Sequence, residues 1–593
     1  MFRRPLILLT LAALALPMAP AAAAGAEKAL PAAERWIPRQ AIVVVSLRRP
    51  KDLLDMALRP ALIEAIRSSA PYKAQAANKG VRDFFNVVKE LERRMDTDWQ
   101  AILRRLVGGG ATWAVGPNQG NVLIVDSLDT EAPKALHELI LAIIRGEAEK
   151  SGVAAEIAPT KVGDVDTWSL GPNEAHAIIG KRTVIATSPK ILQAVLGLRD
   201  GSGGGSVASL PAYRQAKKAA GADATAMLYA NSGVLKNVPQ IAKALAGSNE
   251  PLVSLLAAPL TEAVSKSTWL AVALKAKGQA LGLDVITDGT IDASGAARFA
   301  APATGGGALP NLAVPRRIAA MSLHRDLQGF YAAKDDLFPE RTSGLIFFEN
   351  MMGIFFTGRD LTEEVLAEIG PKARLVVAEQ EYDPAIGTPA TQFPAFALVL
   401  PLKNPKKFNI VVEEAWQKAV GLINFTRGQQ AEPGLIIDRP VHGGTKYTVA
   451  AFAPTEQTDK KAVDDRYNFR PALAMPTGHL ILSSTDGLAE DIIDALRKEA
   501  ASSAKPRAGL HSVVEIEGAQ LASILNANRE ALIRNNMVDK GNTRAQSEAE
   551  MGMLFGVMKH ITRVALTVGT EKGRSKASLR IQLKLPAGKS GGE

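Results

Sequence analysis

A repeated order of segments constrains the fold of this chain more than any other feature. If one unit was copied, both halves have the same fold. Residues 41–47 form an apolar run that ends in a Ser-Leu pair at Leu47. Residues 318–323 form a second run that also ends in Ser-Leu, at Leu323. Charged residues follow both runs. Short apolar runs bounded in this way are typical of buried strands, so we expect one matching strand near the start of each half.

The later segments match in the same order. Each half continues with a short helix that stops at a glycine, a strand, a strand before a longer helix, a strand before a capped helix, and two closing strands. These segments are 101–107, 111–115, 122–125, 183–187, 268–275 and 280–286 in the first half, and 362–369, 373–378, 396–400, 480–484, 563–568 and 576–585 in the second. The first short helix follows Thr97 and Gln100, which have the capping-box spacing. Identities are few, so chance similarity is the alternative to duplication.

We predict an α+β fold of two tandem related halves, each a mostly antiparallel sheet with helices packed on one face. Strands joined by tight turns, such as 175–179 and 183–187, favour antiparallel pairing. The helices between them favour layers over a barrel. The expected parts are a signal peptide at 1–24, a first half at 25–287, a Gly/Ala/Pro-rich linker at 288–310, a second half at 311–587 and a flexible tail at 588–593.

One apolar segment has two interpretations. Residues 345–356 contain several large apolar side chains, including Phe347 and Ile354. The default expectation for such a segment is a buried core helix. The alternative is an apolar wall that faces a ligand.

The first 24 residues have the order of a secretory signal peptide. Arg3 and Arg4 precede a short apolar run at 6–16, and small residues up to Ala24 supply a cleavage site there or at a neighbouring residue. An uncleaved N-terminal anchor is the alternative, whereas attachment through a lipidated cysteine is excluded because cysteine is absent. No later stretch has the roughly 18 consecutive apolar residues of a membrane span. We therefore predict a periplasmic or extracellular protein.

Composition excludes several classes of function. The 593 residues carry a formal charge of +10, spread thinly, and aromatic residues make up 5%. Nucleic-acid binding needs clustered phosphate contacts and is not expected. On net charge alone, the preferred interpretation is a solvated basic surface, and the alternative is a weak attraction to anionic envelope polymers. Without cysteine, stability depends on packing and not on disulfides.

The sequence contains no complete motif for a catalytic nucleophile or for a phosphate-binding loop. Ser202 lacks the leading glycine of a hydrolase elbow. Ser502 and Lys505 have Ser-x-x-Lys spacing but lie in an Ala/Ser/Lys-rich segment after a helix. The glycines at 108–110 follow a helix and precede a strand, which is the reverse of a phosphate loop, and Gly180 sits where a hairpin turn is expected.

Metal-ligand patterns are also incomplete. His137 has Leu141, not a second histidine, four residues later. Glu174 and His176 follow Asp164 and Asp166 in a predicted hairpin, whose turn at 171–174 would place His176 opposite Ser169 and keep Asp166 three pairs away. These are interpreted as polar hairpin edges. His511, Glu515 and Glu517 share one strand face, interpreted as the solvent side of a sheet. We therefore assign no catalytic, cofactor-binding or metal-binding residue and no cofactor.

The chain resembles a known family in three features. These are a strand ending in Ser-Leu, a Thr-led short helix ending in Gly, and a strand running into the Leu-Lys-Asn-Pro-Lys-Lys segment at 402–407. This pattern is similar to a family of exported bacterial proteins catalogued only as a domain of unknown function. The resemblance implies an extracytoplasmic α+β repeat protein and brings no activity, cofactor or catalytic residue.

The leading functional hypothesis is a non-catalytic binding or scaffold protein of the cell envelope that uses its sheet faces or a cleft between its halves. One alternative is an exported hydrolase whose site is assembled from distant Asp, Glu and His residues. A second alternative is a carrier of a small apolar ligand, lined by residues 345–356.

Overall fold

The computed structural model describes residues 30–584, apart from the stretches 61–62, 65–66, 68–71, 73–77, 118–119, 151–158, 170–172, 200–204, 246–247, 249, 291–294, 301–305, 455–458 and 504. The predicted signal peptide at 1–24 and tail at 588–593 lie outside the described residues, as does Ser202. The chain divides into two units. Unit 1 takes its described residues from Met1–Ala242, Ser267–Asp288 and Lys584–Glu593, and unit 2 from Lys243–Lys266 and Gly289–Leu583.

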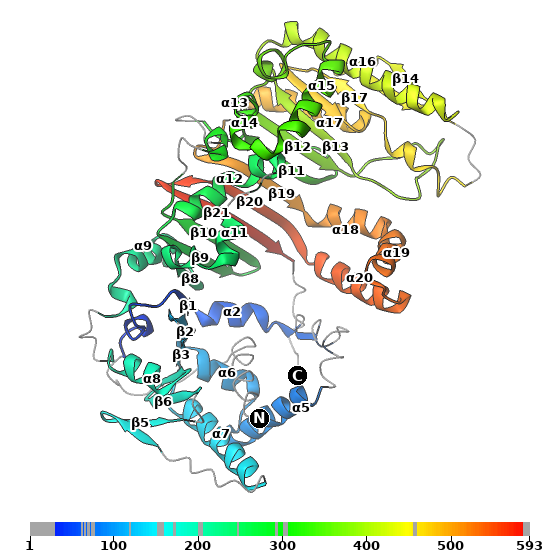
Figure 1. Cartoon of the computed structure of the whole chain (residues 1–593). Helices are drawn as coiled ribbons and strands as arrows, with labels where there is room; N and C mark the ends of the chain where they lie inside the picture. The colour runs from blue at the N-terminus through cyan, green and yellow to red at the C-terminus, as the bar shows by residue number, and fades with distance from the viewer. Residues whose placement is uncertain are drawn as a thin grey trace. The chain divides into compact units, whose positions relative to one another are not determined.

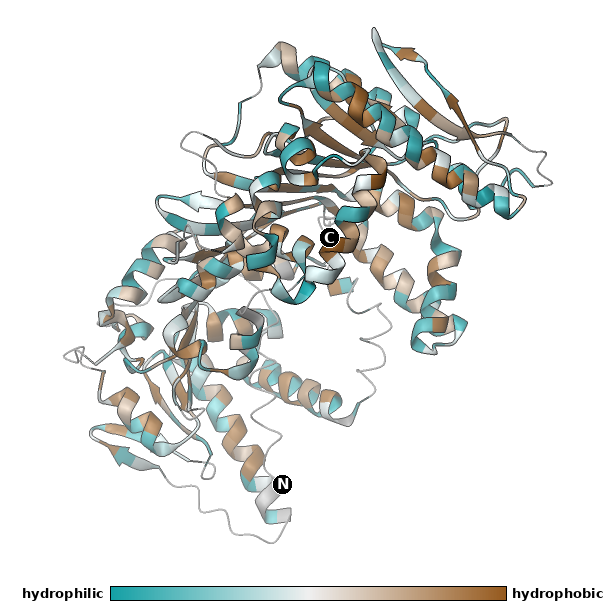
Figure 2. Cartoon of the chain, turned by 45° about the horizontal axis from the view of Figure 1, so that its top comes forward, coloured by the Kyte–Doolittle hydropathy of each residue, from teal (hydrophilic) through white to brown (hydrophobic). Residues whose placement is uncertain are grey.

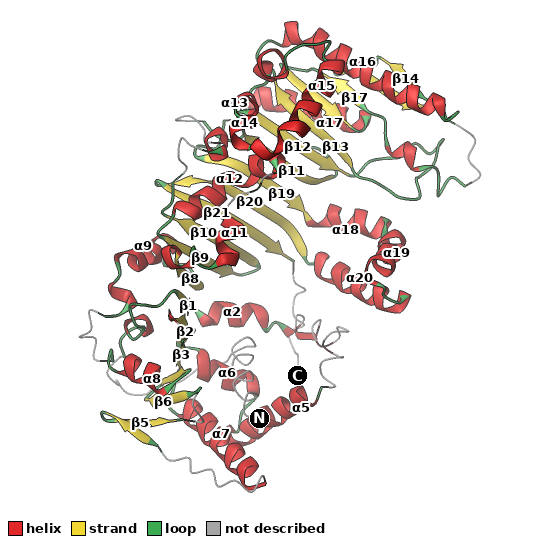
Figure 3. Ribbon diagram, viewed as in Figure 1, coloured by secondary structure: helices red, strands yellow, loops and turns green. Residues whose placement is uncertain are grey.

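Ten strands of unit 1 form an antiparallel sheet (Figure 3). They are β1 (Val43–Leu47), β2 (Gly110–Val115), β3 (Asn121–Asp126), β4 (Thr160–Val162), β5 (Val165–Trp168), β6 (Ala175–Ile179), β7 (Arg182–Ala186), β8 (Ala226–Asn231), β9 (Trp269–Lys277) and β10 (Ala280–Thr287). Their order across the sheet is β4-β5-β6-β7-β3-β2-β1-β8-β9-β10. Gly180, with a φ of 57°, makes the tight turn between β6 and β7 that the sequence predicts.

The main helices of unit 1 lie between these strands. They are α2 (Pro50–Ala57), α5 (Lys79–Met95), α6 (Trp99–Val107), α7 (Glu131–Lys150), α8 (Pro189–Leu196), α9 (Pro211–Ala220) and α10 (Ser232–Leu235), with short 3-10 turns η1 (Ala33–Arg35) and η3 (Val207–Ser209). Helix α6 begins one residue later than a cap at Thr97 would place it, because the carboxylate of Asp98 accepts the backbone N–H of Ala101 at 2.7 Å. Helix α11 (Pro239–Leu245) spans the division between the units.

Unit 2 has a sheet of the same kind, shown with its helices in Figure 1. Its strands are β11 (Arg317–His324), β12 (Lys372–Ala378), β13 (Ala395–Pro401), β14 (Leu435–Asp438), β15 (Val441–His442), β16 (Thr445–Phe452), β17 (Ala472–Ala474), β18 (His479–Ser483), β19 (Leu510–Glu517), β20 (Ile561–Glu571) and β21 (Arg574–Leu583). Their order is β14-β16-β17-β18-β13-β12-β11-β19-β20-β21, and every pair is antiparallel. Strand β15 forms only a short hairpin with β16.

The helical elements of unit 2 are α12 (Pro251–Lys266), η4 (Ala296–Ala300), α13 (Leu327–Ala332), α14 (Lys334–Leu337), η5 (Pro339–Arg341), α15 (Thr342–Phe355), η6 (Leu361–Val365), η7 (Leu366–Glu368), α16 (Pro405–Gln429), η8 (Asp465–Asn468), α17 (Asp486–Ser502), α18 (Gly518–Ala527), α19 (Arg529–Lys540) and α20 (Arg544–Met558). Helix α12 precedes the predicted linker at 288–310 in the chain but packs with η4 and β21 of unit 2. The described part of that linker contains η4.

The two sheets share one strand order. If β15 is left out, each unit has ten strands. The first strand of unit 1 along the chain takes the same position across its sheet as the first strand of unit 2, and the same is true of each later strand. The registers agree as well, because Leu47 of β1 lies opposite Ala111 of β2, and Leu323 of β11 lies opposite Ala373 of β12. The two Ser-Leu strands therefore hold the same central place in the two sheets.

Helices cover both faces of each sheet, whereas the sequence prediction placed them on one. In unit 2, Ala397 packs with Ile492 of α17, and the next residue, Leu398, packs with Phe408 of α16. Neighbouring residues of a strand point to opposite faces, so α17 and α16 lie on opposite sides. In unit 1, the same argument separates α8 from α6. The α+β class and the antiparallel pairing are confirmed.

Helix α15 differs from the expected core helix at 345–356. None of its residues is buried, and Phe347 and Ile354 are 70% and 69% exposed. Figure 2 shows the strands of unit 2 as largely apolar, with apolar and polar bands alternating along α16. Most buried apolar residues of unit 2 lie in its strands and in α16 and α17.

Candidate functional site

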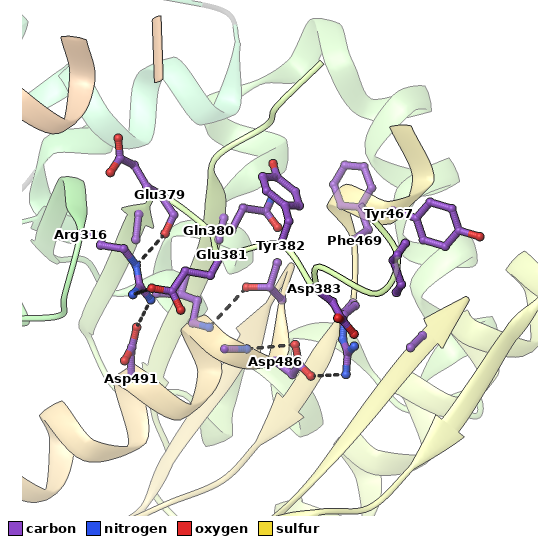
Figure 4. A pocket seen from close by; sticks show the side chains of 18 of the residues that line it. Arg316, Glu379, Gln380, Glu381, Tyr382, Asp383, Tyr467, Phe469, Asp486 and Asp491 are labelled. Atoms are coloured by element: carbon purple, nitrogen blue, oxygen red, sulfur yellow. Dashed lines mark hydrogen bonds and ion pairs between the residues drawn. The ribbon is translucent and has the colours of Figure 1, made fainter. Parts of the chain in front are cut away.

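Two hollows adjoin at one end of the unit 2 sheet. The first, called the polar hollow, has a volume of about 360 Å³ and lies beside the first turn of α17 (Figure 4). Its charged lining residues are Arg316, Glu379, Glu381, Asp383, Arg470, Asp486 and Asp491. Aromatic side chains of Tyr382, Tyr467 and Phe469 also line it.

Both arginines of the polar hollow form ion pairs with carboxylates of its wall. Arg316 forms ion pairs with Glu381 and Asp491, the second at 3.5 Å. Arg470 pairs with Asp486 at 2.6 Å. Burial raises the pKa of Asp491, and nearby carboxylates act in the same direction while Arg316 opposes them. The lining has two guanidinium groups and five carboxylates, so the polar hollow carries an excess of negative charge.

A tyrosine fixes the loop that borders the polar hollow. The hydroxyl of Tyr382 donates to Oδ1 of Asn468 at 2.8 Å. The buried amide of Asn468 donates in turn to the carbonyls of Thr391 and Asp465, at 2.8 and 2.9 Å. Burial raises the pKa of Tyr382, with Asp465 acting in the same direction. Tyr382 is therefore a neutral hydrogen-bond donor at neutral pH.

The second hollow, called the apolar hollow, has a volume of about 590 Å³ and lies between α16 and the sheet. Small-molecule pockets have volumes of roughly 300 to 1,000 Å³. Its lining residues are Phe396, Trp416, Ile423, Arg427, Leu435, Phe452, Arg466, Phe469, Pro471, Ala472, Leu482, Ser483 and Ser484. Phe452 and Phe469 line both hollows, so an apolar and a polar recess meet at these two rings.

The apolar hollow opens because α16 covers the sheet unevenly. The buried residues of this helix end at Val420, although the helix continues to Gln429. Ile423 lies beyond that point and is 43% exposed. Phe396 of β13 and Leu482 of β18 are exposed where the helix leaves the sheet uncovered. Apolar side chains thus border a space that the chain itself does not fill.

Two guanidinium groups border the apolar hollow at Phe452. The guanidinium carbon of Arg427 lies 4.7 Å from the ring centre of Phe452, and that of Arg466 lies 5.9 Å away. Arg427 donates from Nε to the carbonyl of Pro433 at 2.6 Å and pairs with Glu432 at 3.1 Å. These distances are typical of cation–π contacts, so Phe452 orients both cations.

Unit 1 holds a second group of interest, made of residues that the sequence analysis considered separately. The carboxylate of Glu174 lies 2.6 Å from Nδ1 of His176, and both side chains are buried. The ring of His137, on α7, lies 5.1 Å from that of His176 and 4.5 Å from that of Trp168. Burial lowers the pKa of His137, and His176 acts in the same direction.

The predicted hairpin around this group is wrong in register and burial. His176 lies opposite Trp168, one residue from the predicted partner Ser169. Glu174 and His176 are buried and are not polar hairpin edges. Asp164 pairs with Arg199 at 2.7 Å. Residues 171–172 of the predicted turn lie outside the described residues.

The predicted solvent face of the strand at 511–517 is also wrong. His511 is 2% exposed, and its Nδ1 lies 3.0 Å from the hydroxyl of Ser512. Glu515, also buried, pairs with Arg317 and Arg563 at 3.3 and 2.7 Å. Arginine side chains cover this face at Glu515, which alternation along one strand does not reveal.

The remaining motif candidates stay separate. Ser502 ends helix α17 and donates its hydroxyl to the carbonyl of Glu499 at 3.0 Å, like a residue of an ordinary helix end. The glycines at 108–110 join α6 to β2, in the order that argued against a phosphate loop. Within the described part of the chain, no group of three or more His, Asp or Glu residues is placed to hold a metal ion.

Sequence reasoning missed the residues of both hollows. Phe396, Arg427, Phe452 and Arg466 come from four different elements, and no spacing rule links them. One signal was available in the sequence, namely the apolar residues on the last turns of α16, beginning at Ile423. These residues lie beyond the part of the helix that packs on the sheet.

Among the described residues, no helix combines the length and the apolar character needed to cross a bilayer. No family model matches the chain, and a search of curated proteins finds no match. Among solved structures, crystal form III of TP0453 is similar over 45% of this chain and 83% of that one, with 12% identity and a TM-score of 0.24. Crystal form I of TP0453 is similar over 43% and 76%, with 11% identity and a TM-score of 0.22.

Proposed function

We propose that this chain is an exported, non-catalytic binding protein of the cell envelope whose second unit holds a small ligand in the apolar hollow. The observation that carries the proposal is an open recess of about 590 Å³ walled by apolar side chains of α16 and the sheet. Removing apolar ligand surface from water contributes roughly 25 cal/mol per Å². The adjoining polar hollow gives such a ligand a second, hydrogen-bonding region beyond Phe452 and Phe469.

This proposal combines the leading hypothesis with the carrier alternative and relocates the apolar wall. Residues 345–356 do not line either hollow, whereas Trp416 and Ile423 of α16 do line the apolar one. Export rests on the signal-like order of residues 1–24. Membership in the family of exported proteins of unknown function is part of the same proposal.

Duplication of one ancestral unit is also part of the proposal. The shared strand order and the matching register at Leu47 and Leu323 support it. In that view, the gathering of Glu174, His176 and His137 under α7 corresponds to the region under α16. The two copies have different side chains there, which suits one ligand site in unit 2.

The hydrolase alternative would need an activated nucleophile beside the Glu174–His176 pair. Ser169 is near in the chain, but its hydroxyl donates to the backbone carbonyl of Glu174 at 2.8 Å. We therefore favour binding over hydrolysis.

The test is a titration of the mature protein with the neutral fluorescent probe N-phenyl-1-naphthylamine. We expect saturable binding, and we expect Ile423→Glu to weaken it at least about tenfold, because a carboxylate placed in the apolar wall must lose hydration when the probe binds. Ile410→Glu is the matched control, since Ile410 lies on the same helix, is 74% exposed and does not line the hollow. Equal affinities of the two variants, or no saturable binding, would exclude this site.

A further inference from the structure

We propose that the outward faces of α15 and α16 form a docking surface for an anionic lipid bilayer. Its apolar part consists of exposed side chains on the two helices: Phe347, Met351, Ile354, Ile410, Leu422 and Phe425. Its basic part consists of exposed lysines at the start of α16: Lys403, Lys406 and Lys407. None of these described residues lines either hollow, so this docking surface is separate from the proposed ligand site.

The apolar stripe of α15 is turned outward because the other side of the helix is fastened to the unit. Phe347, Met351 and Ile354 have the i, i+4, i+7 spacing of one helix face. Glu349 lies about 200° around the helix from the first of them, and it pairs with Lys334 at 3.2 Å. The outward stripe itself carries no charged residue.

Helix α16 continues the apolar surface beyond the end of α15. The two helices are in contact (Figure 1). The Nζ of Lys418 donates to the carbonyl of Ile354 at 3.5 Å and to Oγ1 of Thr357 at 2.7 Å. Lys418 shares its helix face with Leu422, one turn later, and with Ile410, two turns earlier. These two side chains are 53% and 74% exposed, so apolar groups of both helices flank one contact.

The uncompensated charge of the two helices is positive. Each acidic residue in them forms an ion pair with a lysine or arginine. These acidic residues are Glu349, Glu413 and Glu414. By contrast, Lys403, Lys406 and Lys407 form no ion pair with any residue that the structure describes. One carboxylate lies at this helix start, that of Glu368, which accepts from Nδ2 of Asn404 at 2.7 Å, and the three lysines outnumber it.

An apolar stripe beside unpaired lysines complements a bilayer with anionic headgroups. Apolar side chains of an interfacial helix enter the boundary between headgroups and acyl chains. Lysines beside them are attracted to the negative surface of the leaflet. An anionic lipid surface therefore satisfies both parts of the docking surface, whereas an apolar protein surface would satisfy only one.

The experiment measures co-sedimentation of the mature protein with vesicles of phosphatidylcholine alone or of equimolar phosphatidylcholine and phosphatidylglycerol. We expect binding to the anionic vesicles to be at least about tenfold tighter, because each lysine near an anionic surface adds to the attraction. Higher ionic strength should reduce this difference, since salt screens exposed charges. Equal binding to both vesicles, or no binding to the anionic ones, would overturn the proposal.

A pair of serine variants tests the apolar part. Phe347→Ser combined with Ile354→Ser should weaken binding to anionic vesicles at least about tenfold, because less apolar surface leaves water. Val538→Ser combined with Val557→Ser is the matched control, since these side chains are 82% and 57% exposed but lie on α19 and α20. Urea unfolding of both variants shows that the fold is kept. Unchanged binding after the α15 substitutions would exclude this surface.

A pair of glutamine variants tests the basic part. Lys406→Gln combined with Lys407→Gln should weaken binding to anionic vesicles about tenfold and leave binding to neutral vesicles unchanged. Arg497→Gln combined with Lys498→Gln is the matched control. It removes the same net charge from exposed positions of α17, on the opposite side of the sheet. Equal losses in the two variants would mean that net charge alone drives binding, and the docking surface would be rejected.

A second copy of this chain is the other occupant that the apolar face allows. Analytical ultracentrifugation of the mature protein without vesicles distinguishes the two. A monomer that binds anionic vesicles supports lipid docking. A dimer that Phe347→Ser combined with Ile354→Ser dissociates would assign the face to a second copy and overturn the proposal.

Discussion

Arg182 of β7 lies directly opposite Asp126 of β3 and donates two hydrogen bonds to its carboxylate, at 2.6 and 3.0 Å. The arginine side chain is only 2% exposed, whereas that of the aspartate is 24% exposed. The guanidinium also lies 4.6 Å from the ring centre of Trp36. The pair is thus asymmetric, because water reaches the anion but not the cation.

Because of this asymmetry, we expect removal of the two partners to lower the free energy of unfolding by unequal amounts. Asp126→Ala leaves a buried guanidinium without its counter-charge and should lower the free energy of unfolding by about 3 kcal/mol. Arg182→Met keeps the volume and leaves a carboxylate that water can solvate, so it should cost less, about 1 to 2 kcal/mol. Urea unfolding at pH 7 measures both. An equal or reversed order would contradict the burial difference.

His511 predicts a loss of stability in mild acid. Burial lowers its pKa to about 3, with Arg325 and His324 acting in the same direction, while an unfolded histidine has a pKa near 6.5. Between these values the unfolded chain binds a proton that the folded chain does not, so stability falls as pH falls from about 6.5 toward 3, by at most about 1.4 kcal/mol per pH unit.

The check compares unfolding free energies of the unmodified protein and His511→Gln at pH 7 and pH 5. The variant should lose less stability between the two pH values, by about one proton's contribution. Equal losses would mean that His511 is not responsible for the pH dependence.

Ser188 and Thr485 cap the first turns of α8 and α17, and we expect the loss of either cap to lower stability by a similar amount. The Ser188 hydroxyl accepts the backbone N–H of Ile191, and the Thr485 hydroxyl accepts that of Leu488, each at 3.3 Å. Replacing either by Ala should cost about 1 kcal/mol, because one N–H at the helix start loses its acceptor. Ser188→Asp and Thr485→Asp restore an acceptor and serve as controls. Melting temperatures measure the four variants, and alanine variants as stable as the parent would contradict the caps.

Phe347 and Ile354 lie on the surface, so we expect their replacement to leave the stability of the core unchanged. Phe347→Ser and Ile354→Ser should change the free energy of unfolding by no more than about 0.5 kcal/mol, because these side chains are mostly exposed. Binding of N-phenyl-1-naphthylamine should not change, because neither side chain lines the apolar hollow. Phe408→Ala, in the buried part of α16, is the contrast and should cost about 3 to 5 kcal/mol. Strong destabilisation by the serine variants would place α15 in the core.

Local patterns predicted much of the fold. The strands expected at 111–115 and 373–378 are present as Gly110–Val115 and Lys372–Ala378, each after a short helix. The hairpin turn at Gly180 is present with positive φ. Periodicity, caps and turns depend on neighbours in the chain, so one sequence is enough to locate them.

The sequence predicted the burial of residues less well than the positions of the strands. It did not predict the candidate site. An apolar run such as 345–356 does not encode whether a partner surface covers it, and here none of α15 is buried. His511 follows a strand alternation that predicts one side of a sheet, but only the covering elements decide that this side is closed. The same limit applies to the apolar hollow, whose residues come from separate elements.

The sequence by itself determined the α+β class, the positions of the strands and the parallel order of elements in the two halves, because these follow from short-range periodicity and turn chemistry. The tertiary structure alone decided that α16 stops covering the sheet beyond Val420, and that Arg427 and Arg466 meet at Phe452. Those relationships depend on how helices pack on a sheet across long separations in the chain, where the free energy depends on shape and burial and not on sequence spacing.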